Sequence, residues 1–177
     1  MNFKTSGFTL IELIIIIGIV GFLSAMVITG GNKGADQRKI ILETRRLAEE
    51  IRKVQNMALS SIAQDCGVLG NKVVPSGIIL STALPDRYRL VADCDENKAY
   101  NAGSDILLST VILSASQISL VSPASPLEIF FIPPLPVTAI NTSELDLASA
   151  TITLCGIKDI TLCKYIYINS KGSVSVE

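Results

Sequence analysis

The sequence predicts an α+β protein in which a long N-terminal helix packs on a head built from an antiparallel β-sheet or a small β-sandwich. Three observations lead to this class. Residues 8–28 are almost wholly apolar, residues 37–64 repeat apolar side chains at helical spacing, and the remainder consists of short β-rich runs between turn residues. With 177 residues, the chain is long enough for one main folded domain besides the helix.

The composition excludes several classes of function. The chain has no histidine, no tryptophan and a net charge of −1. Histidine-based catalysis and histidine-ligated metal sites are therefore excluded. The sequence shows no other recognisable catalytic constellation, so we do not expect an enzyme. Without a basic patch or a set of stacking aromatic residues, we expect no nucleic-acid partner either.

The N-terminus combines a short polar stretch with the apolar run. Residues 1–7 carry one cation, Lys4, and residues 8–28 read FTLIELIIIIGIVGFLSAMVI. At 1.5 Å per residue, roughly 21 helical residues span about 30 Å, the thickness of a bilayer core. The alternatives are an ordinary signal peptide and a plain membrane anchor. The run ends in SAMVI, which fits the small-x-small cleavage site of a signal peptide poorly.

One acidic residue, Glu12, lies inside the apolar run. A carboxylate in hydrocarbon costs roughly 2.5 kcal/mol or more, so a functional partner is expected. If the chain is cut after Gly7, the new α-amino cation of Phe8 lies four positions before Glu12, and a neighbouring subunit can supply the same cation. Such a pair is favoured over two lone charges, and it would set the axial register of packed subunits.

Residues 7–13, GFTLIEL, resemble the prepilin motif of type IV pilins and type II secretion pseudopilins. The resemblance implies cleavage after Gly7 by the prepilin peptidase, N-methylation of Phe8, and assembly into a filament in which Glu12 helps to dock incoming subunits. The implied partners are other pilin or pseudopilin subunits, the peptidase and methyltransferase, the inner-membrane assembly platform and membrane lipid. The implied location is the bacterial inner membrane, as a single-pass protein with its head outside the cytoplasm, and then the pilus or pseudopilus filament.

The sequence divides into five segments. Residues 1–7 form the leader, 8–28 the transmembrane or filament-core helix, 29–35 a glycine-rich hinge, 36–64 an amphipathic helix capped by Asp36, and 65–177 the β-rich head. The hinge is expected because each glycine costs about 1 kcal/mol relative to alanine in a helix interior. The apolar stripe of the amphipathic helix consists of Ile40, Ile41, Leu47, Ile51, Val54, Ala58 and Ile62.

Short β-rich runs fill the head. The predicted strands are residues 77–80, 88–92, 106–113, 117–121, 127–132, 150–155, 164–168 and 173–176. Five of the seven prolines lie between Pro123 and Pro136 and flank the run 127–132, which favours an edge strand. A partner-contact loop is the alternative. The last two runs form the clearest hairpin, and this hairpin and residues 46–55 resemble parts of minor pseudopilin H.

Four cysteines, Cys66, Cys94, Cys155 and Cys163, follow the hydrophobic N-terminus without any Cys-x-x-Cys pair, which argues against a zinc knuckle. In an exported head we expect two disulfides, whereas in the cytosol four buried free thiols are the alternative. Cys155 and Cys163 bracket a predicted turn, Cys66 follows the helix, and Cys94 ends a strand. Of the three possible connectivities, the sequence therefore favours Cys155–Cys163 with Cys66–Cys94.

An acidic segment resembles a calcium-binding loop in part. Asp93, Asp95 and Asn97 stand at positions 1, 3 and 5 of such a loop, and Asn101 stands at position 9. Lys98 replaces the glycine expected at position 6, and Ser104 replaces the glutamate expected at position 12. Asp105 follows one residue late and could substitute for that glutamate. The favoured interpretation is a plain acidic surface turn without a cofactor, and calcium held by Asp93, Asp95, Asn97, Asn101 and Asp105 is the alternative.

Two functions agree with these features. The first is a structural, minor subunit of a type IV pilus or type II secretion pseudopilus. It rests on Gly7, Phe8 and Glu12, on the amphipathic helix and on the β-rich head. The second is a membrane-anchored binding module, either an adhesin or a calcium-stabilised head, that does not assemble into a filament.

Overall fold

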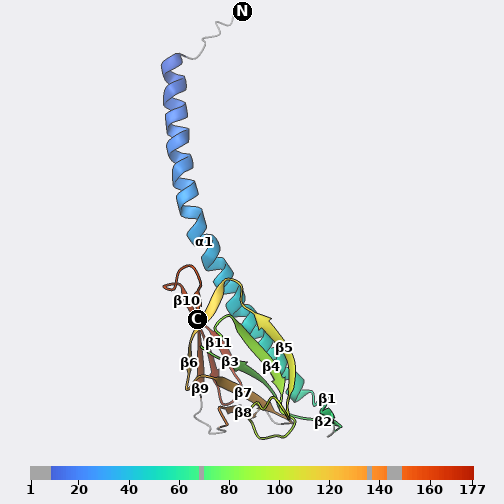
Figure 1. Cartoon of the computed structure of the whole chain (residues 1–177). Helices are drawn as coiled ribbons and strands as arrows, with labels where there is room; N and C mark the ends of the chain where they lie inside the picture. The colour runs from blue at the N-terminus through green and yellow to red at the C-terminus, as the bar shows by residue number, and fades with distance from the viewer. Residues whose placement is uncertain (1–8, 68–69, 135–136, 143–148) are drawn as a thin grey trace, which may run out of the picture. The chain divides into compact units, whose positions relative to one another are not determined.

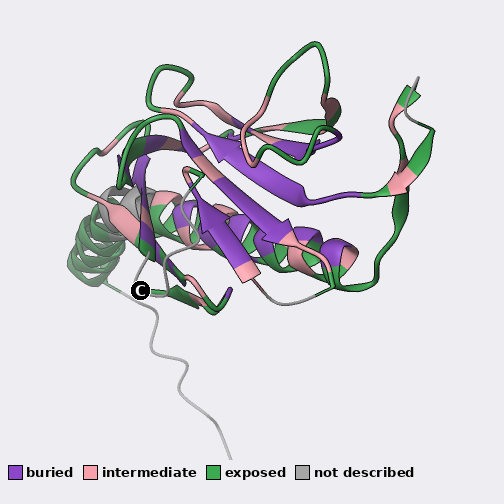
Figure 2. Ribbon diagram, turned by 90° about the horizontal axis from the view of Figure 1, so that it is seen from below, coloured by how far each residue is buried: buried purple, intermediate pink, exposed green. Residues whose placement is uncertain are grey.

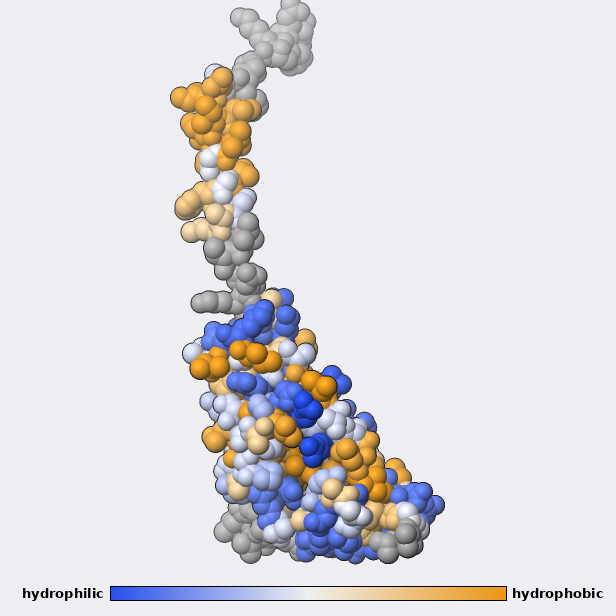
Figure 3. Space-filling model, in the orientation of Figure 1, coloured by the Kyte–Doolittle hydropathy of each residue, from blue (hydrophilic) through white to orange (hydrophobic). Residues whose placement is uncertain are grey.

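The computed structural model describes residues 9–67, 70–134, 137–142 and 149–177, and for residues 27–33 it describes the backbone alone. The chain divides into two compact units, Met1–Asp36 and Gln37–Glu177. The described part of the first unit is the N-terminal portion of helix α1, which runs from Leu10 to Leu59. Its described side chains up to Met26 are exposed, and Figure 3 shows that they are mostly hydrophobic. No helix within the described residues has the combined length and hydropathy of a membrane span.

The helical backbone continues through the glycine-rich residues 29–35, where the sequence predicted a break. Glycine weakens a helix but keeps its backbone N–H group, unlike proline, so the hydrogen-bond ladder can pass through it. Asp36 consequently lies inside α1, and its predicted role as a helix cap is wrong. Mobility of this segment stays a prediction.

Helix α1 ends at Leu59, earlier than the predicted end at residue 64. The chain turns at Ser61, whose φ of 50° is left-handed and cannot continue a right-handed helix. Residues Ala63–Asp65 then form strand β1, which pairs with β2 (Asn71–Val73) as a separate two-stranded sheet. The sequence did not indicate either strand, because runs of three residues are too short to show an alternating pattern.

The second unit contains two further antiparallel sheets (Figure 1). The five-stranded sheet has the order β5-β4-β3-β7-β8, with β3 (Ser76–Leu80), β4 (Arg87–Ala92), β5 (Ile106–Ile112), β7 (Leu127–Ile132) and β8 (Val137–Ile140). The four-stranded sheet has the order β11-β10-β9-β6, with β6 (Ser116–Ser122), β9 (Ser149–Gly156), β10 (Cys163–Asn169) and β11 (Val174–Val176). The predicted α+β class, with a helix packed on antiparallel sheets, is confirmed.

One core joins the C-terminal portion of α1 to both of these sheets. Leu47, Ile51 and Val54 are fully buried and belong to the same cluster as Ile78 of β3 and Ile152 of β9. Figure 2 shows this burial on one side of the helix and on the strands that face it. Apolar side chains at helical spacing thus give α1 the stripe that both sheets cover.

Two details of the stripe and the strands differ from expectation. Ile62 was included in the stripe, but it follows the end of α1 and is 50% exposed. The run 127–132 was expected at a sheet edge, whereas β7 lies inside the five-stranded sheet between β3 and β8. The prolines flank β7 and do not interrupt it, so its N–H groups remain free to pair on both sides.

The C-terminal hairpin is confirmed. β10 and β11 pair through Ile166–Val176, Tyr167–Ser175 and Ile168–Val174. The turn between them contains Gly172 with a left-handed φ of 76°, a conformation that glycine adopts without steric cost.

Candidate functional site

The predicted assembly site is described from Thr9 onward, since Gly7 and Phe8 lie outside the described residues. The Glu12 carboxylate bonds back to Thr9 at the start of α1. Its Oε2 accepts hydrogen bonds from the backbone N and the Oγ1 of Thr9, both at 2.9 Å, and the Glu12 N donates to Thr9 Oγ1 at 3.4 Å. This reciprocal arrangement is a capping box.

The capping box adds a local role for Glu12 to its predicted role in assembly. The sequence carried the signal, because Thr9-x-x-Glu12 has the spacing of a capping box in front of an apolar run. The reported bonds use Oε2, and Oε1 accepts none from the described residues. One carboxylate oxygen of Glu12 can therefore cap the helix while the other faces a cation.

The structure contains two disulfides, Cys66–Cys94 and Cys155–Cys163, which is the connectivity that the sequence favoured. Cys155 and Cys163 lie directly opposite each other where β9 and β10 pair. Cys66 follows β1 and Cys94 follows β4. The Cys66–Cys94 disulfide therefore ties the small two-stranded sheet to the five-stranded one.

The acidic segment brings the three predicted carboxylates together, with the side chains of both predicted asparagines hydrogen-bonded to Asp95. Oxygens of Asp93, Asp95 and Asp105 lie within 4.8 Å of one another. The side-chain oxygen of Asn97 instead accepts the Ala99 N–H at 2.8 Å. The backbone N–H of Asn101 donates to Asp105 Oδ2 at 2.7 Å, and its side chain hydrogen-bonds to Asp95. The five predicted residues thus form one hydrogen-bonded cluster, in which Asn97 Nδ2 donates to Asp95 Oδ2 at 3.1 Å.

Asp93 and Asp95 differ in burial, and the pKa values of their carboxyls are shifted in opposite directions. Asp93 is fully buried, and this desolvation raises the pKa of its carboxyl to about 6 although the backbone N–H groups of Lys98 and Asn97 donate to it. The pKa of the exposed Asp95 is lowered, chiefly by the hydrogen bond from Ser104 Oγ at 2.8 Å. Carboxylate oxygens are the ligands that calcium prefers, yet backbone donors already occupy several of them.

Lys98 stands at the position where a calcium loop usually has glycine, and its backbone φ is 63°. The chain therefore makes the left-handed turn that glycine would make there, with a lysine in its place. The turn geometry agrees with the predicted loop, but backbone N–H groups already donate to the carboxylate oxygens of Asp93 and Asp105. Calcium binding stays a prediction.

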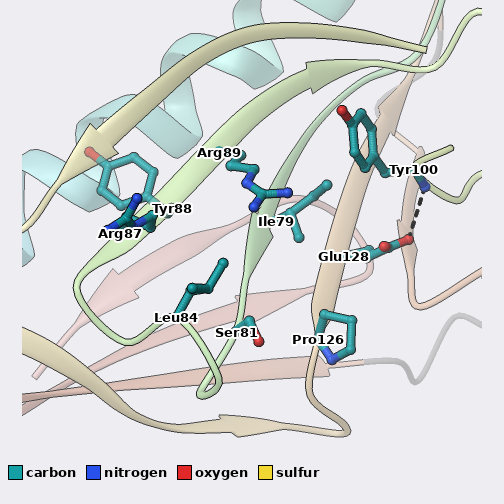
Figure 4. A pocket seen from close by; sticks show the side chains of 9 residues that line it. All are labelled: Ile79, Ser81, Leu84, Arg87, Tyr88, Arg89, Tyr100, Pro126 and Glu128. Atoms are coloured by element: carbon teal, nitrogen blue, oxygen red, sulfur yellow. Dashed lines mark hydrogen bonds between the residues drawn. The ribbon is translucent and has the colours of Figure 1, made fainter. Parts of the chain in front are cut away.

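A small open pocket lies on the outer face of the five-stranded sheet, on the side of β3 and β4 away from α1 (Figure 4). Its volume is about 240 Å³, below the roughly 300–1,000 Å³ of typical small-molecule sites. Glu128 on one side of it accepts the Tyr100 N–H at 3.2 Å, and burial raises the pKa of this carboxyl. The lining residues are Ile79, Ser81, Leu84, Arg87, Tyr88, Arg89, Tyr100, Pro126 and Glu128.

The comparison with known families concerns the N-terminus. Residues 2–28 match the family model described as the prokaryotic N-terminal methylation motif. This match supports a pilin-type or pseudopilin-type subunit, and it covers the predicted processing and assembly residues but no part of the head. No curated protein and no solved structure matches the chain at a significant level. The resemblance to minor pseudopilin H stays a prediction.

Proposed function

We propose that the chain is a structural, minor subunit of a type IV pilus or a type II secretion pseudopilus. The observation that carries this proposal is the methylation motif over residues 2–28, with Glu12 placed at the start of a long helix whose described N-terminal side chains are apolar. A helix of that character favours packing against lipid or against other copies of itself.

The chemistry of assembly begins with cleavage after Gly7. Cleavage frees the α-amino group of Phe8, and N-methylation keeps that nitrogen basic and therefore cationic at neutral pH. The cation then has a partner in the Glu12 carboxylate of the same or a neighbouring subunit, because one oxygen of that carboxylate is not used by the capping box. Away from water such a pair is worth more than at the protein surface.

The cellular setting follows from the same processing. The subunit resides in the bacterial inner membrane with its head outside the cytoplasm, where disulfides persist. The peptidase and methyltransferase act on the leader, and the inner-membrane platform passes the subunit into the filament. The two disulfides of the head agree with this placement.

The experiment separates the two roles of Glu12. Glu12→Gln keeps a side chain that can complete the capping box and removes the charge, whereas Glu12→Ala removes both. In a strain that carries the variant as its sole copy, we expect both proteins to be processed and both to be lost from sheared filaments. Immunoblots of cell and filament fractions measure this, with Gly7→Val as the control that should block processing itself. Normal incorporation of Glu12→Gln would contradict the charge-pair role.

A further inference from the structure

The pocket on the outer face of the five-stranded sheet has two opposite charges on either side of an apolar floor. Ile79 of β3 lies directly opposite Arg89 of β4 on one side and directly opposite Glu128 of β7 on the other. Residues that pair in this way place their side chains on the same face of a sheet. The Cα atoms of Arg89 and Glu128 are therefore two strand spacings apart, about 9.5 Å. Figure 4 shows the two charged groups on either side of Ile79.

The charge of Arg89 is not compensated by the described part of the chain. Arg89 is half-buried, and its guanidinium forms no ion pair and no hydrogen bond with the described residues. Arg87 on the same strand differs, because its guanidinium is paired with Asp86 at 2.7 Å. A half-buried guanidinium without a partner has lost part of its hydration and gained no counter-charge. Arg89 therefore favours an anionic group in the pocket.

The Glu128 carboxyl on the other side of Ile79 has no cation beside it among the described residues. Its Oε2 accepts the Tyr100 N–H at 3.2 Å, and no described residue donates to its Oε1. Burial raises the pKa of this carboxyl, and the charge of Asp105 raises it further, as expected where no cation offsets the loss of water. Glu128 therefore favours a cationic group in the same pocket.

The space between these charges is small, and its floor is apolar. Its volume of about 240 Å³ equals that of about eight waters at roughly 30 Å³ each, so an occupant has on the order of eight non-hydrogen atoms. Ile79 forms the floor and is 8% exposed. Leu84, in the turn between β3 and β4, lies at one end, and Tyr100 lies at the other (Figure 4). Tyr100 is held there by packing against the apolar cluster that includes Val91 and Phe130.

The two charges and the small volume together select the chemistry of an occupant. A small ligand that carries only an anion would meet the like charge of Glu128, and one that carries only a cation would meet the like charge of Arg89. A ligand with both charges compensates both residues. The molecule of this size that carries both charges and an apolar part for Ile79 is a free α-amino acid with an aliphatic side chain.

We infer that this pocket binds a free aliphatic α-amino acid, whose carboxylate pairs with Arg89, whose ammonium group pairs with Glu128, and whose side chain lies on Ile79. The inference goes beyond the proposed filament, because it assigns a ligand to the head and uses no residue of the N-terminal helix. The sheet positions both charged residues through the register of three neighbouring strands, so the site exists before the ligand arrives.

Matched ligands test the two charges separately. The full-length protein in detergent micelles is titrated by calorimetry with L-leucine, with isocaproate, which lacks the ammonium group, and with isoamylamine, which lacks the carboxylate. We expect L-leucine to bind saturably and each analogue to bind about 10–100-fold more weakly, because one charge-assisted hydrogen bond is lost. Glycine keeps both charges but lacks the apolar side chain, so it should also bind more weakly than L-leucine.

Two variants locate the binding at this pocket. Glu128→Gln keeps an oxygen for the Tyr100 N–H and removes the charge, and Arg89→Gln removes the guanidinium. Each should weaken L-leucine binding about 10–100-fold. The losses should be selective, because Arg89→Gln should not weaken binding of isoamylamine and Glu128→Gln should not weaken binding of isocaproate. Arg45→Gln and Glu49→Gln, on the exposed face of α1, are the matched controls and should bind L-leucine as the wild type does.

Each outcome bears on the inference. No binding of L-leucine by the wild type at millimolar concentration would overturn it, as would equal affinities for L-leucine and both single-charge analogues. Binding that both pocket variants retain in full would place the ligand elsewhere and would also overturn it. The ligand series needs only the wild type, so the test holds even if a variant fails to fold. Normal filament incorporation of Glu12→Gln would leave these titrations unchanged, so the two proposals fail independently.

Discussion

At the scale of single residues, Glu43 of α1 accepts six hydrogen bonds from residues 114–116. Its Oε1 accepts hydrogen bonds from the N and Oγ of Ser114, and its Oε2 accepts from the N and Oγ of Ser116, all between 2.6 and 2.8 Å. The N–H of Ala115 is shared between both oxygens. Burial by itself would raise the pKa of Glu43, but these donors together hold it below its usual value. The carboxylate thus fastens the turn between β5 and β6 to the helix.

Glu43→Gln should lower the free energy of unfolding by about 1–3 kcal/mol near neutral pH, because an amide oxygen replaces two charged acceptors. The folded-state pKa is depressed, so the stabilisation is present above the usual pKa of glutamate, about 4.3, and is lost as pH falls through the folded value. Denaturant titrations at several pH values should show wild type and variant converging in acid. Glu49→Gln, on the exposed face of the same helix, is the matched control, and an equal loss there would refute the assignment.

The calcium prediction also belongs to this scale. If Asp93, Asp95 and Asp105 hold the ion, millimolar calcium should raise the melting temperature relative to chelator, because a ligand that binds only the folded state stabilises it. Asp95→Asn should remove that increase, whereas Asp86→Asn, outside the cluster, should retain it. An identical melting temperature of the wild type with calcium and with chelator would refute calcium binding at this cluster.

At the scale of elements, the sequence predicted the helical residues on both sides of the glycine-rich segment and most strands of the head, but it missed the continuity of α1 and its end at Leu59. Period 3.6 located the buried stripe of α1, since that repeat places Leu47, Ile51 and Val54 on one side. Eight predicted runs coincide with strands to within two residues at either end. Strand β8 was missed because Val137–Ile140 has four residues next to prolines, and its pairing with β7 is supplied by tertiary contacts.

The stripe of α1 can be tested by truncation. Ile51→Ala should lower the free energy of unfolding by about 2–5 kcal/mol, because Ile51 is fully buried between both sheets and the lost methylenes would leave a cavity. Leu42→Ala on the same helix, where the side chain is 63% exposed, should cost less than about 0.5 kcal/mol. Chemical denaturation of both variants measures the difference, and similar costs would mean that the stripe is not the packing surface.

At the scale of the whole molecule, the two disulfides close loops of different length. The cysteines are 28 residues apart in Cys66–Cys94 and 8 residues apart in Cys155–Cys163. Chain-entropy arguments make the longer loop the more stabilising one, about 3.5 against about 2.5 kcal/mol. The double variant Cys66→Ser with Cys94→Ser should therefore lower the melting temperature more than the double variant Cys155→Ser with Cys163→Ser, as measured by thermal unfolding. The reverse order would show that native-state packing, and not loop closure, sets the contribution.

The sequence by itself determined the features that depend on local order along the chain. The motif around Gly7, Phe8 and Glu12, the apolar run, the helical stripe and the short strands are all patterns of neighbouring residues, and local periodicity reports them directly. The same reasoning favoured Cys155–Cys163, since both cysteines bracket one turn.

Only the tertiary structure decided which strands lie inside a sheet and which lie at its edge. Prolines around residues 127–132 suggested an edge, yet β7 is internal and the proline-free β5 is open. Likewise, Glu43 meets the turn at Ser114–Ser116 across some 70 positions of sequence, and Asp93 is buried while Asp95 is exposed. These outcomes depend on long-range packing, where residues far apart in sequence compete for the same partners, and no local pattern encodes the result of that competition.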